Sequence, residues 1–294
     1  MTTRVVRWVA ALVVAAGIVT VPPATPAAGA PAAASAVSPG QRDASRLAMG
    51  DASRSAARDG FDAVTWNVLY TTPARRLAPI LKGFRARGVT LALMNEAGGA
   101  DLTRMIRAQG WRSCAPRGQW RVAWDPTRWA RDSRCRAIRL SPSTYYSMTS
   151  RRWTTTYAAT IRLRDRESGL KLRTYSYHLP THVQRPPILA NRVRVSAEAM
   201  RRLHELAEHH PHADAVLAGG DDNLDERFGG RARWPLYVSQ PGGLRLVQPP
   251  AGTLGRHGRR VDDFRTISLD PGRGWTAPSG GDHQAHGRAF RWHP

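Results

Sequence analysis

Short apolar runs with β-strand character alternate with segments of helical periodicity along most of the chain. In the strand-like runs, apolar, β-branched and aromatic side chains alternate with polar ones or follow one another without a break. In the helical segments, apolar side chains recur every three or four positions. The expected strands are residues 63–68, 89–94, 121–124, 154–163, 170–177, 215–217, 261–267 and 289–292. The expected helices are residues 73–87, residues 101–109 with Asp101 as a possible cap, and residues 188–210, which Pro211 ends.

This order of elements favours a mixed-sheet α/β sandwich. A hairpin is expected where the charged turn at 164–169 joins two strands, whereas other strands are joined through helices. Such a mixture is typical of mixed sheets rather than of one purely parallel sheet. Residues 37–60 are rich in small and polar residues without apolar periodicity, which indicates a flexible linker. We therefore expect a single folded domain over residues 61–294.

The first 36 residues have the composition of a secretory signal peptide. Arg4 and Arg7 precede an apolar run from Trp8 to Val21, and Pro- and Ala-rich sequence follows. The run is shorter than the roughly 20 residues that a membrane-spanning helix needs, so cleavage and secretion are favoured over an uncleaved anchor. We expect the mature protein to be extracellular, monomeric and not stably inserted in a membrane.

Cys114 and Cys135 are the only cysteines of the chain. In an exported protein, an isolated pair of this kind favours a disulfide, and two buried free thiols are the alternative. The disulfide would stabilise the fold by roughly 3 kcal/mol by restricting the unfolded chain.

The charge of the chain is strongly positive, at +22, and Lys82 and Lys171 are its only lysines. Nearly all of the excess is therefore arginine, whose planar guanidinium binds phosphate through two hydrogen bonds. A polyanionic partner follows, either nucleic acid or an anionic membrane surface. An arginine excess that reflects genome composition and a soluble surface explains the same number, so the charge alone does not decide the partner.

Polar side chains follow the predicted strands at or just beyond the point where each strand ends. Open α/β sheets place their functional sites at such positions. The residues concerned are Asn67, Glu96, His178, Asp221, Asn223, Asp262, Asp282 and His283. Each of them alone has an ordinary structural explanation, such as turn formation in the Gly-Gly-Asp-Asp-Asn run. Their occurrence together indicates a site.

Hydrolysis of a phosphodiester requires a divalent cation, an activated water and donors to the phosphate oxygens. The oxygens of Glu96, Asp282 and Asn67 suit a hard cation, for which we expect Mg²⁺, with Ca²⁺ or Mn²⁺ as alternatives. A histidine held by a carboxylate is a common acid/base unit, and either Asp262 with His283 or Glu96 near His178 could form one.

In their order along the chain, these segments resemble the motifs of the endonuclease/exonuclease/phosphatase superfamily, which includes pancreatic-type deoxyribonuclease. The similarity covers residues 61–294 and departs from the family at Asn95, Asp263 and Gly281, where Gln, an aromatic or His, and Ser are usual. The segments that carry it are Thr65-Trp66-Asn67-Val68, Leu93-Met94-Asn95-Glu96, Tyr177-His178-Leu179, Gly220-Asp221-Asp222-Asn223, Arg260-Val261-Asp262-Asp263-Phe264 and Gly281-Asp282-His283.

The resemblance implies a four-layer sandwich, with two mixed β-sheets packed face to face and helices outside. It also implies metal binding by Asn67, Glu96 and Asp282. Water activation would fall to Asp221 and to the pair of His283 with Asp262, and phosphate binding to His178 and Asn223.

Further phosphate contacts are expected from Arg152 and Arg260, and Tyr145 or Tyr146 could place a phenol near the phosphate. The sequence thus predicts a secreted, metal-dependent phosphodiesterase that hydrolyses DNA or RNA. A sphingomyelinase-like phospholipid phosphodiesterase or a phosphatase of the same fold is the first alternative. A lipid substrate calls for an exposed apolar patch, for which Trp234-Pro235-Leu236-Tyr237 is a candidate. A non-catalytic polyanion-binding protein is the second alternative, and its binding would not respond to a chelator.

Overall fold

The computed structural model describes residues 60–117, 119–147, 151–183, 189–224, 243–254, 260–280 and 282–293. The expected signal peptide, the expected linker except Gly60, and the apolar segment at 234–237 lie outside these residues, as do residues 255–259 before Arg260. All described elements belong to the unit Ala48–Pro294.

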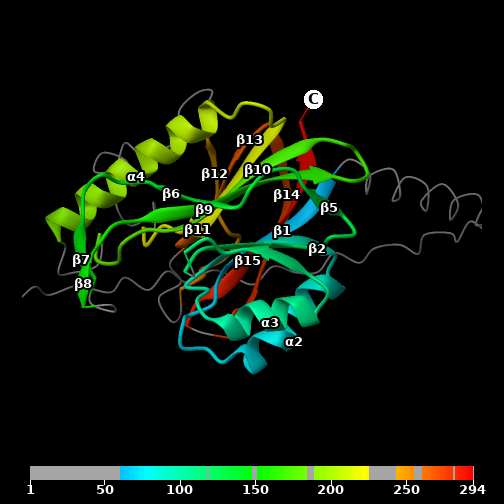
Figure 1. Cartoon of the computed structure of the whole chain (residues 1–294), viewed down its shortest axis with the longest axis horizontal. Helices are drawn as coiled ribbons and strands as arrows, with labels where there is room; N and C mark the ends of the chain where they lie inside the picture. Colours follow the sequence, from blue (N-terminus) through cyan, green and yellow to red (C-terminus); the bar gives the residue numbers. More distant parts are fainter. Residues whose placement is uncertain are drawn as a thin grey trace, which may run out of the picture. The chain divides into compact units, whose positions relative to one another are not determined.

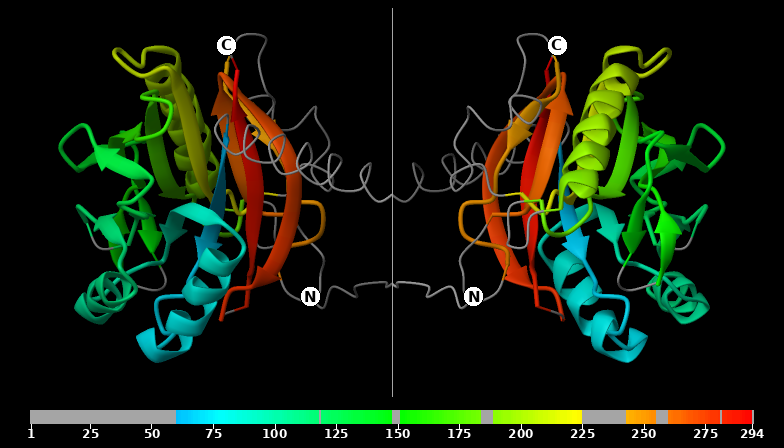
Figure 2. Two further views of the ribbon diagram at one scale, coloured as in Figure 1. Left: turned by 90° about the vertical axis from the view of Figure 1, so that its right-hand side faces the viewer. Right: turned by 90° about the vertical axis from the view of Figure 1, so that its left-hand side faces the viewer.

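One sheet has six strands in the order β14-β15-β1-β2-β4-β3. Its strands are β1 (Gly60–Asn67), β2 (Val89–Asn95), β3 (Arg112–Cys114), β4 (Arg121–Trp124), β14 (Leu269–Pro278) and β15 (Gln284–Trp292). Only β1 and β2 are paired in parallel, and helix α2 (Ala74–Ala86) connects them. Helix α3 (Ala100–Ala108) follows β2. Figure 2 shows β1, in blue, beside the red and orange strands of the other end of the chain.

The second sheet has seven strands in the order β12-β13-β11-β10-β9-β5, with β6 also paired to β9. Its strands are β5 (Trp129–Arg131), β6 (Arg136–Arg139), β9 (Tyr157–Asp165), β10 (Lys171–His178), β11 (Ala215–Asp221), β12 (Arg245–Val247) and β13 (Asp262–Ile267). Here β10 and β11 form the parallel pair, and helix α4 (Ala190–Glu208) connects them. A separate ribbon pairs β7 (Tyr145–Ser147) with β8 (Arg152–Thr154).

The apolar core lies in three clusters that separate four layers. Strand β2 shows how the sequence produces them, because its buried side chains point alternately to its two faces. Leu91 and Leu93 join the cluster between the two sheets, whereas Ala92 and Met94 join the cluster under α2 and α3. A third cluster packs α4 on the outer face of the second sheet. The structure therefore has the expected sandwich of two mixed sheets between helices (Figure 1).

Every strand and helix expected from the sequence is present, with ends that differ by a few residues. The strands that the pattern does not predict are β3, β5, β6, β7, β8, β12 and β14. Most of them have only three or four residues, too few to show a period. The long strand β14 contains Pro271, Gly272, Gly274 and Pro278, which normally indicate turns.

The expectation that Asp101 caps α3 is wrong. Gly99 is the N-cap, with φ of 97°, and no side chain caps this helix. Asp101 instead lies in the first turn, where it pairs with Arg104. Its negative charge there interacts favourably with the positive end of the helix dipole.

Cys114 and Cys135 form the expected disulfide, with 5.4 Å between their Cα atoms. The bond joins β3, at the edge of the first sheet, to the segment between β5 and β6 of the second. None of the helices in the described parts of the chain is long and apolar enough to span a bilayer.

Candidate active site

The site lies where strands of both sheets end at one edge of the sandwich. Asn67 ends β1, and Glu96 directly follows its parallel neighbour β2. His178 and Asp221 end the other parallel pair, β10 and β11, and are partners in the register of these strands. Asp262 begins β13 opposite Asp221, because β13 runs antiparallel to β11. The topology thus brings together five residues that are far apart in the sequence.

Asn67 connects the two sheets at this edge. Its buried amide nitrogen lies 3.3 Å from Oε1 of Glu96 and 3.2 Å from Oδ2 of Asp221. Its amide oxygen accepts a hydrogen bond from the backbone N–H of Leu69, at 3.0 Å. Asn67 therefore holds the two carboxylates through its nitrogen, and its role as a metal ligand stays a prediction.

Asp262 and His283 form a buried pair, with Oδ2 of Asp262 2.7 Å from Nδ1 of His283. His283 lies just before β15, and its free Nε2 atom points toward Asp221, 3.6 Å from Oδ2. This leaves Nε2 as the ring atom available to a substrate or water.

The charges of this pair affect one another strongly. Burial lowers the pKa of His283, but Asp262 and then Asp221 outweigh burial and raise this pKa to about 10. Burial raises the pKa of Asp262 to about 6 against the attraction of His283, and the negative charge of Asp221 adds to the rise. At neutral pH the pair is thus an imidazolium in contact with a carboxylate.

The Gly-Asp-Asp-Asn segment at the end of β11 forms a turn that orients two side chains of the site. Oδ1 of Asp221 accepts the backbone N–H of Asn223 at 2.7 Å, and Asn223 adopts a left-handed conformation with φ of 52°. The amide nitrogen of Asn223 donates to the carbonyl of Leu179 at 2.8 Å and lies 3.0 Å from Nε2 of His178. A neutral His178 accepts this hydrogen bond at Nε2. The turn therefore orients both Asp221 and His178.

The residues present fit a hard divalent cation. Glu96 and Asp221 turn carboxylate oxygens toward the same amide nitrogen, and Nε2 of His178 lies 3.7 Å and 3.5 Å from these oxygens. Converging carboxylates repel each other, and a bound divalent cation would neutralise them. Within the described residues, Asp221, Asp262 and His283 also form a group whose ligand atoms lie within 4.8 Å of one another.

Asp282 is the predicted metal ligand that the structure does not place in this group. It is exposed next to His283, whose pKa it helps to raise. The described contacts do not bring it to Glu96, so metal binding by Asp282 stays a prediction.

A cavity of about 120 Å³ opens beside Glu96 and His178 and has residues in its wall that sequence analysis missed. Arg192 of α4 is 3% exposed and donates to Thr181 and to the carbonyl of Tyr146. The sequence offered one signal for it, because it is a charged residue on the otherwise small and apolar buried face of α4. Tyr145, which the sequence suggested as a phenol near the phosphate, lines the same cavity.

The two arginines predicted to contact phosphate lie in different settings. Arg152 is exposed at the start of β8, and Arg260 donates to the carbonyl of Pro250 at 3.0 Å. Gly219 and Gly220 lie in the buried strand β11, where neighbouring atoms leave no room for a Cβ atom. A Cβ atom on Gly220 would lie 2.2 Å from the carbonyl oxygen of Tyr177.

Asp263, a departure from the family motif, belongs to a buried polar network on the α4 side of β13. Arg265 and Asp222 form an ion pair of 2.7 Å in which neither side chain is exposed. Burial and then Asp222 raise the pKa of Tyr177 well above its ordinary value, and Asp263 adds to this. The charge of Arg265 thus explains how Asp263 can be buried here.

Comparison with solved structures identifies the fold that carries this site. No protein-family model matches the chain, and no curated protein matches its sequence. An endonuclease/exonuclease/phosphatase from Bacteroides vulgatus superposes with a TM-score of 0.62 at 8% identity, covering 79% of this chain and 99% of that one. The chain has the endonuclease/exonuclease/phosphatase fold.

Two other structures with this fold are similar to the chain to the same degree. Humanized D. rerio TDP2 has a TM-score of 0.61 at 14% identity, covering 79% of this chain and 99% of that one. A mannosyl-6-phosphatase of Bacteroides thetaiotaomicron has a TM-score of 0.60 at 12% identity, covering 79% and 100%. The candidate site lies at the ends of the parallel strands of this endonuclease/exonuclease/phosphatase fold.

Proposed function

We propose that the protein is a secreted, divalent-metal-dependent phosphodiesterase that hydrolyses the backbone of DNA or RNA. The observation that carries the proposal is the convergence of Glu96, Asp221 and the Asp262–His283 pair at one edge of the fold. Such a set combines cation ligands, a proton acceptor and a cationic donor, which are the groups that phosphodiester hydrolysis requires.

Glu96 would hold the divalent cation beside Asp221, and Asn67 would keep both carboxylates in place through its amide nitrogen. Asp282 is proposed as a further ligand. The cation supplies Lewis-acid stabilisation of the negative charge that develops on the phosphate oxygens. Glu96 has a left-handed backbone, with φ of 51°, a conformation that costs energy for a residue other than glycine. Strain of this kind is typical of functional sites.

The remaining side chains divide the handling of protons and charge. Asp221 is the carboxylate at the centre of the cluster, and we assign it the proton of the attacking water. The imidazolium of His283 donates from Nε2 to an oxygen of the phosphate, where it stabilises negative charge. We assign another phosphate oxygen to Asn223 and to a His178 protonated at Nε2, which would exchange their mutual hydrogen bond for hydrogen bonds to that oxygen. As water attacks phosphorus, the bond to the leaving oxygen breaks, and that oxygen takes a proton from solvent.

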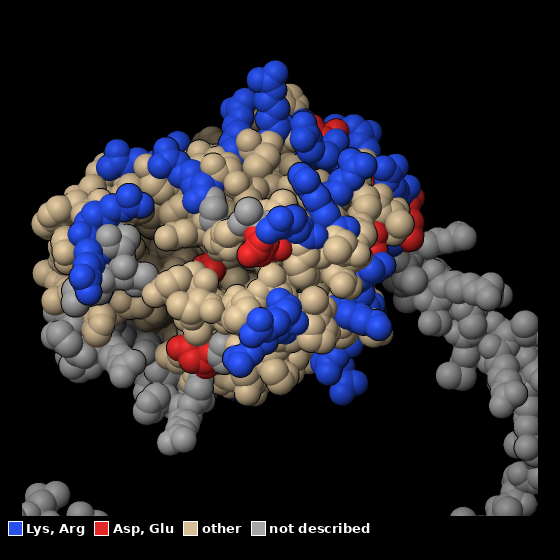
Figure 3. All heavy atoms as spheres, turned by 60° about the horizontal axis from the view of Figure 1, so that its bottom comes forward, with Lys and Arg blue, Asp and Glu red and all other residues tan. Residues whose placement is uncertain are grey.

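Surface charge and exposed aromatic residues support nucleic acid as the substrate class. Figure 3 shows basic side chains over much of one face of the protein, with acidic side chains at fewer places. The β7–β8 ribbon, whose Tyr145 and Ser147 line the cavity beside Glu96, also carries two exposed aromatic residues. Tyr146 and Trp153 are 41% and 65% exposed and form an edge-to-face pair. Aromatic side chains next to arginine are a common platform for unstacked bases.

One similar structure supports the same substrate class. D. rerio TDP2 is described in complex with a single-strand DNA product. The second candidate function is hydrolysis of a phospholipid or a sugar phosphate. The exposed aromatic pair of the ribbon would also suit a lipid surface, and the mannosyl-6-phosphatase has the same fold.

Rates with matched substrates test the proposal. The full chain is supplied with Mg²⁺ and offered single-stranded DNA, single-stranded RNA, sphingomyelin vesicles and mannose 6-phosphate. We expect cleavage of a nucleic acid at least tenfold faster than of the other substrates. Glu96→Gln should raise the Mg²⁺ concentration needed for half-maximal rate, whereas the control Glu167→Gln, which removes an acid paired with Arg128, should not. Faster turnover of vesicles or of the sugar phosphate would contradict the proposal.

A further inference from the structure

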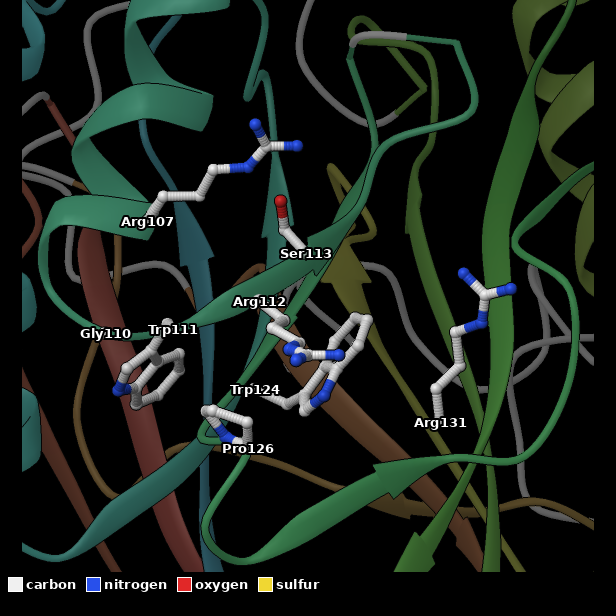
Figure 4. A pocket seen from close by; sticks show the side chains of 8 residues that line it. All are labelled: Arg107, Gly110, Trp111, Arg112, Ser113, Trp124, Pro126 and Arg131. Carbon is white, nitrogen blue, oxygen red and sulfur yellow. The ribbon is translucent and has the colours of Figure 1, made fainter.

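A second cleft lies at the opposite end of the first sheet from the active site. It has a volume of about 570 Å³ and runs between the end of α3, strands β3 and β4, and the end of β5 (Figure 4). Trp124, in its wall, pairs with Leu91 near the start of β2, whereas Glu96 follows the end of that strand. Four strand positions separate Leu91 from Asn95, so the cleft and the site are more than about 13 Å apart along the strand.

Three arginines line this cleft, and none of the described residues in its wall is acidic. Arg107, Arg112 and Arg131 come from α3, β3 and β5, and all three are exposed. In Figure 4 the side chains of Arg107 and Arg131 stand on opposite sides of the cleft, and that of Arg112 lies near Trp124. Three like charges around one hollow repel each other unless an anion binds between them.

Unlike other arginines of the fold, these three have no partner of opposite charge among the described residues. Arg128 pairs with Asp165 at 2.7 Å, and Arg164 pairs with Asp132 at 2.9 Å. By contrast, the side chains of Arg107, Arg112 and Arg131 form no hydrogen bond or ion pair with any described residue. Their guanidinium groups are therefore free to bind an external anion.

The walls of the cleft are held in place by covalent and packing contacts. The disulfide joins Cys114, two residues after Arg112, to Cys135, four residues after Arg131. The indole rings of Trp111 and Trp124, 2% and 3% exposed, line the cleft between the arginines. The backbone positions of the three arginines thus depend little on flexible loops, so binding need order only their side chains.

We propose that this cleft is an exosite that binds the phosphodiester backbone of a nucleic acid at a distance from the cleavage site. Guanidinium groups bind phosphate through paired hydrogen bonds, and the net charge of the whole chain, +22, complements a long polyanion. Because the cleft lies at the other end of the sheet, it acts on long strands and not on short ones. The exosite rests on nucleic acid being the substrate class proposed above.

Binding measurements with a matched charge control test the exosite. The probe is a fluorescent 40-nucleotide single-stranded DNA in the presence of EDTA, compared with a 6-nucleotide DNA. Arg112→Ala with Arg131→Ala should weaken binding of the 40-mer about tenfold. It should also lower the slope of log Kd against log salt by about 1.4, the loss of two phosphate contacts. The control, Arg201→Ala with Arg202→Ala, removes equal charge from the exposed face of α4 and should change both far less.

Equal weakening by the two double variants would overturn the exosite, because it would show that only total charge matters. Equal loss on the 6-mer and the 40-mer would overturn the dependence on length. Binding of anionic vesicles, but not of DNA, through Arg112 and Arg131 would overturn nucleic acid as the ligand. The proposed nuclease function is tested separately, by measuring whether the unmodified chain cleaves DNA with Mg²⁺. If cleavage is absent while the two double variants still differ in binding, the exosite stands and the nuclease proposal falls.

Discussion

Replacing Asp262 by Asn removes the charge that contributes most to the raised pKa of His283. That pKa lies at about 10, against an ordinary histidine value of about 6.5. The difference corresponds to roughly 5 kcal/mol of preference for the imidazolium. Burial opposes this preference, so with Asp262 neutral only Asp221 and Asp282 still favour the charged ring. We expect Asp262→Asn to lower the pKa of His283 from about 10 toward the ordinary histidine value.

The same change has a consequence for stability whose sign follows from linkage. A histidine with a raised folded-state pKa stabilises the fold at low pH, and this stability is lost as pH rises through the folded pKa. Without metal, the unmodified chain should therefore lose up to about 4 kcal/mol between pH 7 and 10 that Asp262→Asn does not lose. At neutral pH the variant should hydrolyse substrate about 10² to 10⁴ times more slowly, with partial recovery on acidification.

NMR titration of the His283 ring in EDTA, with urea unfolding at pH 7 and 10, measures both effects. Asp282→Asn is the matched control, because it removes an exposed carboxylate next to the same ring. It should shift the pKa of His283 far less. A midpoint that stays near 10 in Asp262→Asn, or an equal fall in the control, would refute the assignment of the imidazolium to Asp262.

Three further predictions concern residues whose conformation or bonding the structure defines. Gly220→Ala should destabilise the fold by about 1–3 kcal/mol, seen as a lower urea midpoint, because its Cβ would overlap the carbonyl of Tyr177; an unchanged midpoint would contradict that overlap. Glu96→Gly should abolish metal-dependent cleavage and be about 1 kcal/mol more stable than Glu96→Ala, which loses the same carboxylate but keeps the left-handed strain; equal stability of the two variants would show that strain is absent there. Cys114→Ser with Cys135→Ser should cost roughly 3 kcal/mol of unfolding free energy, and reduction of the unmodified chain should reproduce this loss.

The sequence was sufficient for the layers of the fold because its long elements carry strong periodicity. Strands such as β2 and β11 are buried on both faces and appear as continuous apolar runs. The short edge strands have too few residues to show a period, and their partners are distant in sequence. β14 was missed because its pairing with β15 overrides the turn preference of its prolines and glycines.

The site was partly predictable for a similar reason. Its residues could be named because they follow strand ends, but their mutual orientation depends on contacts between the two sheets. The amide nitrogen of Asn67 facing both Glu96 and Asp221 is such a contact. The arginine cleft was not predictable either, because Arg107, Arg112 and Arg131 belong to three elements that meet only in the folded chain.

Cleavage of supercoiled plasmid tests the central claim most directly. The purified protein is incubated with plasmid and Mg²⁺, beside one sample with EDTA and one of the His283→Ala variant. The claim predicts nicked circles in the first sample and supercoiled plasmid in both controls. Plasmid that stays supercoiled with Mg²⁺, or nicking that persists in EDTA and in His283→Ala, would contradict metal-dependent phosphodiester hydrolysis at this site.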